Sequence, residues 1–138
     1  MKKWGIGILV ENGPDKHAAH PNRRRICSTP EEMLDAVSAL NHPLVGTCWD
    51  TGHANMQRLD QYEAIMTLGK TLKAVHIHDN NGEVDQHVLL FQGTMKWEPF
   101  VKALGDNEYD GDFTFEACTS VRNVPEPLKR DISKLMYK

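Results

Sequence analysis

The chain has 138 residues, of which 40% are hydrophobic and 25% are charged, and its formal net charge at pH 7 is −3. A chain of this length and composition builds one domain with a hydrophobic core, which excludes extended disorder. The small negative charge provides no long-range attraction for nucleic acid or for an anionic membrane.

The cysteine content and the first apolar run bear on the location of the protein. Cys27, Cys48 and Cys118 are widely spaced and odd in number, which is typical of reduced thiols rather than of a disulfide framework. The apolar run after Lys2 and Lys3 ends at Glu11, so it is too short for a signal-peptide core or a membrane span. We therefore expect a cytoplasmic protein that does not bind a membrane.

The first part of the chain predicts one strand, one loop and one helix. An apolar strand runs from Ile6 to Val10, and the polar stretch from Asp15 to Cys27 shows no periodicity, so we expect a loop there. Residues 30–40 carry apolar side chains at helical spacing. Thr29 is the expected N-cap of this helix, with Glu32 reaching back to close a capping box.

The rest of the chain continues to alternate between strands and helices. The expected elements are a strand at 45–50, a helix at 55–69, a strand at 72–79, a helix at 97–104, a strand at 112–118 and a helix at 127–136. The order β-α-β-α-β-α-β-α predicts a parallel sheet with right-handed crossovers. No change of composition marks a linker, so residues 1–138 are expected to form a single domain.

Each of the four predicted strands runs into a residue that commonly binds metal ions. These residues are Glu11, Asp50, His76 and Glu116. Because the carboxyl ends of parallel strands lie side by side, we expect the four side chains to converge. Three carboxylates and one imidazole suit a divalent ion such as Mn, Mg, Co or Zn. Without a cation, the crowded charged groups would repel and raise one another's pKa.

Each of these residues alone has an ordinary explanation, since a glutamate at a strand end is usually solvated and a histidine in an apolar run is usually a core residue. The metal hypothesis depends on the four positions together. His76 and His78 are predicted to face the same side of the strand, so periodicity leaves open which of them is the ligand. Asp79 is a candidate to orient either ring.

Two further polar groups have an open interpretation. His53, Asp85 and His87 are candidates for a second metal ion or for binding substrate hydroxyls, and a plain polar loop explains them equally well. The basic triplet Arg23 to Arg25 is either a clamp for a phosphate or carboxylate, or a solvated loop, which we favour.

Five blocks of residues together resemble the xylose isomerase-like TIM barrels, which include sugar isomerases and epimerases and the endonuclease IV type of apurinic-site nuclease. The blocks are Leu9-Val10-Glu11-Asn12, Trp49-Asp50-Thr51-Gly52-His53, His76-Ile77-His78-Asp79, Asp85-Gln86-His87 followed by Gly93 and Trp97, and Phe115-Glu116. They follow one another in the order that this family has.

The resemblance implies roles for these residues. Glu11, Asp50, His76 and Glu116 would hold a divalent cation at the C-terminal face of the barrel, with His76 preferred because the strand in this family usually reads His-x-x-Asp. In the nuclease branch the positions of His53, Asp85 and His87 hold a further zinc ion, whereas in the isomerase branch such positions meet the sugar.

The resemblance covers only the second half of a barrel that usually needs about 250 residues. The expected fold is therefore α/β: a parallel (βα)4 half of a TIM barrel that a second chain completes. An isolated half would expose two edge strands and an apolar inner face. We accordingly expect a homo-oligomer or a partner chain that carries the complementary half-barrel.

The leading functional hypothesis is a divalent-metal-dependent isomerase or epimerase of a sugar, polyol or keto-sugar. Glu11 and Glu116 would transfer a proton at a metal-bound hydroxy-ketone. One alternative is an apurinic-site phosphodiesterase, which the acidic charge balance makes less favourable. The other is a half-barrel that binds metal but catalyses nothing.

Overall fold

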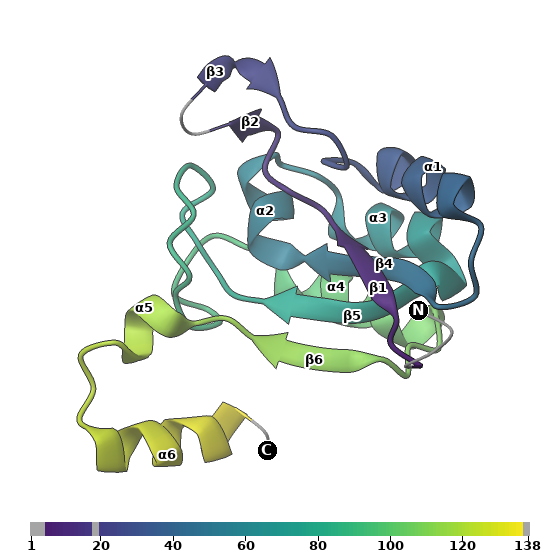
Figure 1. Ribbon diagram of the computed structural model, residues 1–138. Coiled ribbons are helices and arrows are strands. Elements are labelled where there is room, and N and C mark those ends of the chain that lie inside the picture. Colours follow the sequence, from purple (N-terminus) through teal and green to yellow (C-terminus); the bar gives the residue numbers. More distant parts are fainter. Residues whose placement is uncertain (1–4, 18–19, 137–138) are drawn as a thin grey trace.

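The computed structural model describes residues 5–17 and 20–136 as a parallel sheet with helices packed against one face (Figure 1). The elements in chain order are β1 Ile8–Glu11, β2 Lys16–His17, β3 His20–Arg24, α1 Pro30–Leu40, β4 Val45–Asp50, α2 Thr51–Met56, α3 Gln61–Leu68, β5 Leu72–Ile77, α4 Trp97–Asp106, β6 Asp112–Phe115, α5 Cys118–Val121 and α6 Glu126–Met136. A short 3-10 turn, Gly69–Thr71, links α3 to β5.

The main sheet has the strand order β1-β4-β5-β6, and each neighbouring pair is parallel. The predicted alternation of strands and helices is confirmed, and the four parallel strands form the (βα)4 arrangement that the sequence predicted. Helices α1, α3 and α4 lie on one face of the sheet in Figure 1, and α5 and α6 follow β6 at its edge. Within the described residues, β1 and β6 are therefore the two edge strands.

The hydrophobic core fills the space between the sheet and these three helices. Trp49, Ile65, Val75 and Phe100 are all at most 2% exposed, and they come from β4, α3, β5 and α4. The Trp49 indole donates a hydrogen bond to Gln61 Oε1 at 2.8 Å, so its one polar atom is satisfied in the core. This packing holds the two central strands rigidly against the helices.

Two expectations about the segments that connect the strands are wrong. The stretch from Asp15 to Cys27 is not a plain loop, because it contains the antiparallel hairpin β2-β3. The helix expected at 55–69 is two helices, and the first of them begins directly after β4. Asp50 is its N-cap and accepts a hydrogen bond from the backbone N–H of His53 at 2.7 Å, so the strand passes into the helix without a turn.

The capping box of α1 is present in a shifted form. Thr29 is the N-cap and accepts from the backbone N–H of Glu32 at 3.4 Å. The Glu32 carboxylate reaches Ser28 N–H at 3.0 Å rather than that of Thr29. The helix start is therefore where the pattern predicted it, with the reciprocal bond one residue earlier.

In the described part of the chain, no helix combines the length and the apolar composition that crossing a membrane needs.

Candidate functional site at the carboxyl ends of the strands

The side chains predicted as metal ligands lie at one end of the sheet. Glu11 ends β1, Asp50 ends β4, His76 lies near the end of β5, and Glu116 directly follows β6. The parallel ladder pairs Asp50 with His76, and Glu116 N–H continues the ladder by donating to Ile77 O at 2.9 Å. The register itself therefore brings these residues to the same edge.

His76 lies between the two carboxylates of the edge strands. Its Nδ1 is 3.2 Å from Glu11 Oε1 and 3.2 Å from Glu116 Oε1. The three side chains are partly exposed, with Glu11 the most open at 39%. Two acidic groups thus face one imidazole nitrogen from opposite edges of the sheet.

Asp50 is fully buried and is held on several sides. Its Oδ1 accepts from His53 N–H, and His78 Nε2 lies 3.1 and 3.2 Å from its two oxygens. The side chain of Asn12 binds its backbone in both directions, donating to Asp50 O at 3.0 Å and accepting from Asp50 N–H at 2.6 Å. Asn12 in this way extends the β1-β4 ladder past the last residue of β1.

Sequence reasoning assigned no role to Asn12. It is buried with no exposed surface, and its carbonyl accepts a hydrogen bond from His53 Nδ1 at 2.8 Å. The other ring nitrogen of His53, Nε2, faces the Asp85 carboxylate. The signal in the sequence was only the position of Asn12, directly after Glu11.

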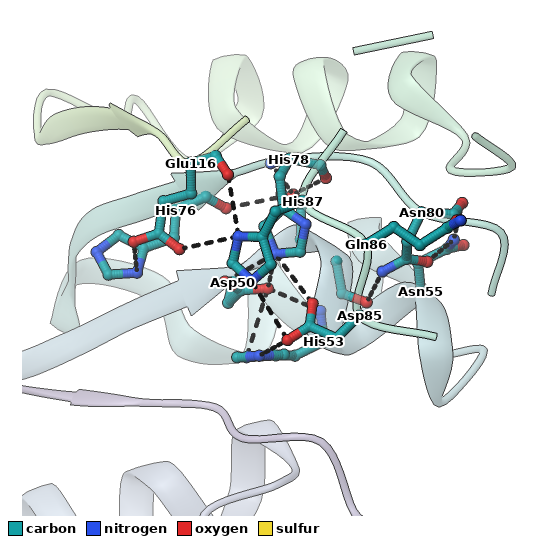
Figure 2. A network of polar contacts seen from close by, with 12 residues as sticks. Asp50, His53, Asn55, His76, His78, Asn80, Asp85, Gln86, His87 and Glu116 are labelled. Carbon is teal, nitrogen blue, oxygen red and sulfur yellow. Dashed lines mark hydrogen bonds and ion pairs between the residues drawn. The ribbon is translucent and has the colours of Figure 1, made fainter. Parts of the chain in front are cut away.

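The second predicted group lies in the same cluster. His53 Nε2 is 3.4 Å from Asp85 Oδ2, and His87 Nε2 is 3.3 Å from the same oxygen. His87 Nδ1 donates to the backbone oxygen of Glu116 at 2.9 Å. Figure 2 shows these side chains turned toward Asp50 and His78. The loop that carries Asp85 and His87 therefore folds back over the strand ends.

The expected mutual repulsion of the charged groups does not govern Asp85. Its hydrogen bond to His53 lowers the pKa of Asp85 to about 2, against the opposing effect of burial. Burial lowers the pKa of His53, but the hydrogen bond to Asp85 and the charge of Asp50 outweigh it and raise the value to about 9. Imidazoles interleaved with the carboxylates thus offset the negative charge.

Cys48 lies two residues before Asp50 but brings no reactive thiolate to the cluster. Burial, together with the charges of Glu11 and Asp50, raises the pKa of its thiol to about 12. Because the thiolate is the form that attacks substrates and binds metals, this side chain acts as a small apolar residue. All three cysteines of the chain are free.

Asp79 does not orient either histidine ring, contrary to the expectation. Its Oδ1 accepts from the backbone N–H groups of Asn80 and Met95 at 2.8 and 3.1 Å, and its Oδ2 accepts from Trp97 Nε1 at 3.2 Å. The carboxylate therefore ties the long loop after β5 to the start of α4. Its effect on the cluster is indirect, since this loop carries Asp85 and His87.

One arginine of the basic triplet, Arg24, forms ion pairs within the fold. Arg24 forms an ion pair with Asp15 at 2.7 Å and a second with Glu32, which anchors the hairpin to α1. The guanidinium of Arg24 is consequently not free to bind a phosphate or carboxylate of a substrate. This arrangement agrees with the structural interpretation rather than with the clamp.

The donor set of the cluster fits a divalent cation. Among the described residues, three groups bring ligand atoms within 4.8 Å of one another: Glu11, Asp50 and His53; Asp50, His78 and Glu116; and His78, Asp85 and His87. The donors are carboxylate oxygens and imidazole nitrogens, which suit Mn, Mg, Co and Zn. Asp50 and His78 each belong to two of these groups, so the three groups form one connected cluster.

Residues 1–137 match the family described as xylose isomerase-like TIM barrel. The chain belongs to this family. A curated relative, the ketose 3-epimerase of Arthrobacter globiformis, is 30% identical over 101 residues, which cover 73% of this chain and 33% of the relative. An uncharacterised protein of Methanocaldococcus jannaschii is 31% identical over 129 residues, 91% of this chain and 40% of that protein.

Solved structures of the family share the fold. A D-tagatose 3-epimerase-like protein superposes with a TM-score of 0.71 at 28% identity, over 97% of this chain and 51% of its own. A D-allulose 3-epimerase from Methylomonas sp. superposes with a TM-score of 0.69 at 25% identity, over 83% of this chain and 36% of its own. The chain thus spans about half or less of the length of these relatives.

Proposed function

We propose that this chain is the metal-binding half of a divalent-metal-dependent sugar epimerase or isomerase that acts on a keto-sugar. The observation that carries the proposal is the placement of Glu11 and Glu116 at 3.2 Å on either side of His76. Relatives that are a ketose 3-epimerase and a D-allulose 3-epimerase support the substrate class. The sequence match to the first covers 73% of this chain, and the structural superposition on the second covers 83% of it.

Glu11, Asp50, His76 and Glu116 would hold the ion: the first two share a candidate metal group, and His76 lies 3.2 Å from both Glu11 and Glu116. A divalent cation, whether Mn, Mg, Co or Zn, supplies a positive charge that makes a C–H bond next to a carbonyl more acidic. Asp50 reaches the site from a rigid strand end and is held by backbone and imidazole donors, so its orientation is set before any ligand binds.

Glu11 and Glu116 are the proposed proton-transfer groups. One carboxylate removes the proton from the carbon next to the carbonyl, and the other returns a proton from the opposite side, which inverts that carbon in an epimerase. Both side chains are partly exposed at the open end of the sheet, as contact with a substrate requires. His53 is proposed to hold a substrate hydroxyl, with Asp85 and His87 completing that side of the pocket.

The proposal includes a partner for the sheet. β1 and β6 pair on one side only within the described residues, and Ile8 and Phe113 on these strands are 50% and 45% exposed. A second copy or a complementary half-barrel chain would satisfy both edges and complete a substrate pocket. Nothing in the net charge favours nucleic acid as a partner.

The test is exchange between epimers. The full chain is incubated with Mn or Co and with candidate ketohexoses in deuterated water, and the sugar is followed by NMR for epimer formation and for deuterium at the inverted carbon. Glu116→Gln should abolish both signals, whereas Glu126→Gln, an exposed site on α6, should leave them unchanged. Activity retained in Glu116→Gln would refute the assignment.

The nuclease alternative has one observation in its favour, the proximity of His53, Asp85 and His87, which could take a further metal ion. Metal analysis separates the two functions, because one ion per chain supports the epimerase and three zinc ions in the assembled barrel support the nuclease. Binding of metal without any turnover would identify an inactive half-barrel, consistent with the partial length of the chain relative to its relatives.

A further inference from the structure

His78 is an imidazole enclosed at the centre of the cluster, one residue after the end of β5. Its side chain has no exposed surface. Its Nε2 lies 3.1 and 3.2 Å from the two oxygens of Asp50, and 3.8 Å from Asp85 Oδ1. Because a carboxylate only accepts hydrogen bonds, the short contact to Asp50 places a proton on Nε2.

The ring of His78 is packed against two neighbours. It stacks on His87, with ring centroids 3.9 Å apart and an angle of 8° between the planes. The edge of the ring that contains Cε1 faces Gly52 of α2, where an added Cβ would come within 2.0 Å of Cε1 and 2.5 Å of both ring nitrogens. Gly52 is therefore the residue that leaves room for this imidazole.

The backbone of His78 is fixed as firmly as its ring. The hydroxyl of Thr51 donates to His78 O at 2.9 Å and accepts from His78 N–H at 3.2 Å. Thr51 directly follows Asp50, so the end of β4 and the end of β5 are joined at both main chain and side chain. This arrangement allows little rotation of the imidazole.

The environments of His76 and His78 differ in a way that the sequence did not reveal. His76 is 24% exposed, and its Nδ1 lies between Glu11 and Glu116. Nε2 of His78 is engaged by the Asp50 carboxylate, and Nδ1 is buried beside Gly52 without a hydrogen-bond partner. The His76 nitrogen lies instead between two partly exposed carboxylates at the end of the sheet.

We propose that His78 is a positioning residue for the metal site and that His76 is the imidazole ligand from β5. His78 holds the Asp50 carboxylate through Nε2–H and sets the plane of the His87 ring by stacking. The inference rests on the proposed metal-dependent function, which it deepens by assigning separate roles to the two histidines. Partners of ligands that act in this way typically change metal affinity by about 10–100-fold when they are replaced.

The experiment uses Mn²⁺ alone with the full chain and three variants, His78→Phe, His78→Gln and His76→Gln. Affinity is measured by titration, nitrogen coordination by the ¹⁴N modulation of the Mn²⁺ electron spin echo, and folding by thermal unfolding of the metal-free protein. His78→Phe keeps a flat ring but removes the donor, whereas His78→Gln keeps an N–H donor in place of Nε2–H.

We expect His78→Phe to bind Mn²⁺ about 10–100-fold more weakly and His78→Gln to recover most of the affinity. The ¹⁴N modulation should remain in His78→Gln and fall in His76→Gln. Loss of the modulation in His78→Gln would make His78 a ligand and overturn the inference, as would unchanged affinity in His78→Phe. If His78→Phe does not fold, His78→Gln alone decides through its modulation and affinity.

The same measurements separate this inference from the proposed function. If the unaltered chain binds no Mn²⁺, the metal-dependent function fails and the role of His78 fails with it. If the unaltered chain binds Mn²⁺ and only the predicted differences between the variants are absent, the proposed function stands and the positioning role alone is refuted.

Discussion

The centre and the edges of the sheet contribute to the cluster in different ways. At the centre, the ends of β4 and β5 carry Asp50 and His78, which have no exposed surface and which bind each other directly. At the edges, β1 and β6 carry Glu11 and Glu116, which are 39% and 30% exposed. The central groups are positioned by packing within the chain, while the edge carboxylates sit on strands that each have one open side.

This difference suggests that the centre and the edges of the proposed site have different roles. A pre-organised centre suits residues that bind and orient an ion, because their geometry does not depend on the ligand. More open carboxylates at the edges suit proton transfer to and from a substrate that must enter and leave. Variants at the centre should therefore affect metal affinity and folding, and variants at the edges should in addition affect turnover and association.

The largest effect is expected from Asp50→Ala. This change removes a ligand and the N-cap of α2 together, so Mn²⁺ affinity should fall by more than about 100-fold, beyond what supporting residues usually cost. Asp60→Ala is the matched control, because Asp60 caps α3 in the same manner, outside the cluster. It should cost about 1 kcal/mol of stability with no loss of metal affinity. Equal affinities in the two variants would remove Asp50 from the site.

The next effect concerns the packing of His78 on Gly52. In Gly52→Ala the new methyl group would overlap the enclosed ring, so the free energy of unfolding should fall by about 1–3 kcal/mol in urea titrations. Gly105→Ala provides the comparison, since Gly105 lies in α4 with no heavy atom within 4 Å of an added Cβ. That change should stabilise the protein by about 0.5–1 kcal/mol. A Gly52→Ala protein as stable as the unaltered chain would contradict the enclosure of His78.

A smaller effect is expected from pH in the metal-free protein. The folded pKa of His53 is about 9, above the unfolded value of about 6.5, so its stabilising contribution is complete below about pH 6.5. It is lost as the pH rises through 9. Asp85 behaves oppositely, because its pKa is lowered to about 2 and its contribution disappears only as the pH falls from about 4 toward 2.

Urea titrations at pH 6 and pH 9.5 in the presence of a chelator measure this effect. The unaltered chain should lose stability between the two values, and His53→Asn should lose less, since Asn carries no titrating proton. A pH dependence that is the same in both proteins would show that His53 does not carry the effect.

The smallest effect on stability is expected at the edges. Ile8→Glu replaces an exposed side chain, so the free energy of unfolding should change by less than about 0.5 kcal/mol. The charge should nevertheless weaken association at the β1 edge, visible as a lower sedimentation coefficient at micromolar concentration. Val101→Glu changes another exposed apolar residue, on α4, and should leave association unaltered. A monomeric unaltered chain would count against the proposed partner.

The sequence by itself determined the strand and helix order and the kinds of side chain at the strand ends. Both depend on local patterns: apolar runs that end in Glu, Asp or His, and a helix start marked by Thr29 and Pro30. The family blocks also predicted that the chain corresponds to the second half of the barrel, because the order of the ligand types along the chain is part of the pattern. The sequence did not show the hairpin β2-β3, whose short strands carry no alternating apolar residues.

Only the tertiary structure decided how the members of the cluster differ from one another. Alternation along a strand predicts the same orientation for His76 and His78. In the structure His76 lies between two partly exposed carboxylates, whereas His78 is enclosed by Gly52 and His87. The bonds from Asn12 to Asp50 join residues 38 positions apart, and the partners of Asp79 lie in the following loop and helix. Burial and partner choice depend on such distant contacts, which arise when the parallel strands align and have no counterpart in local sequence.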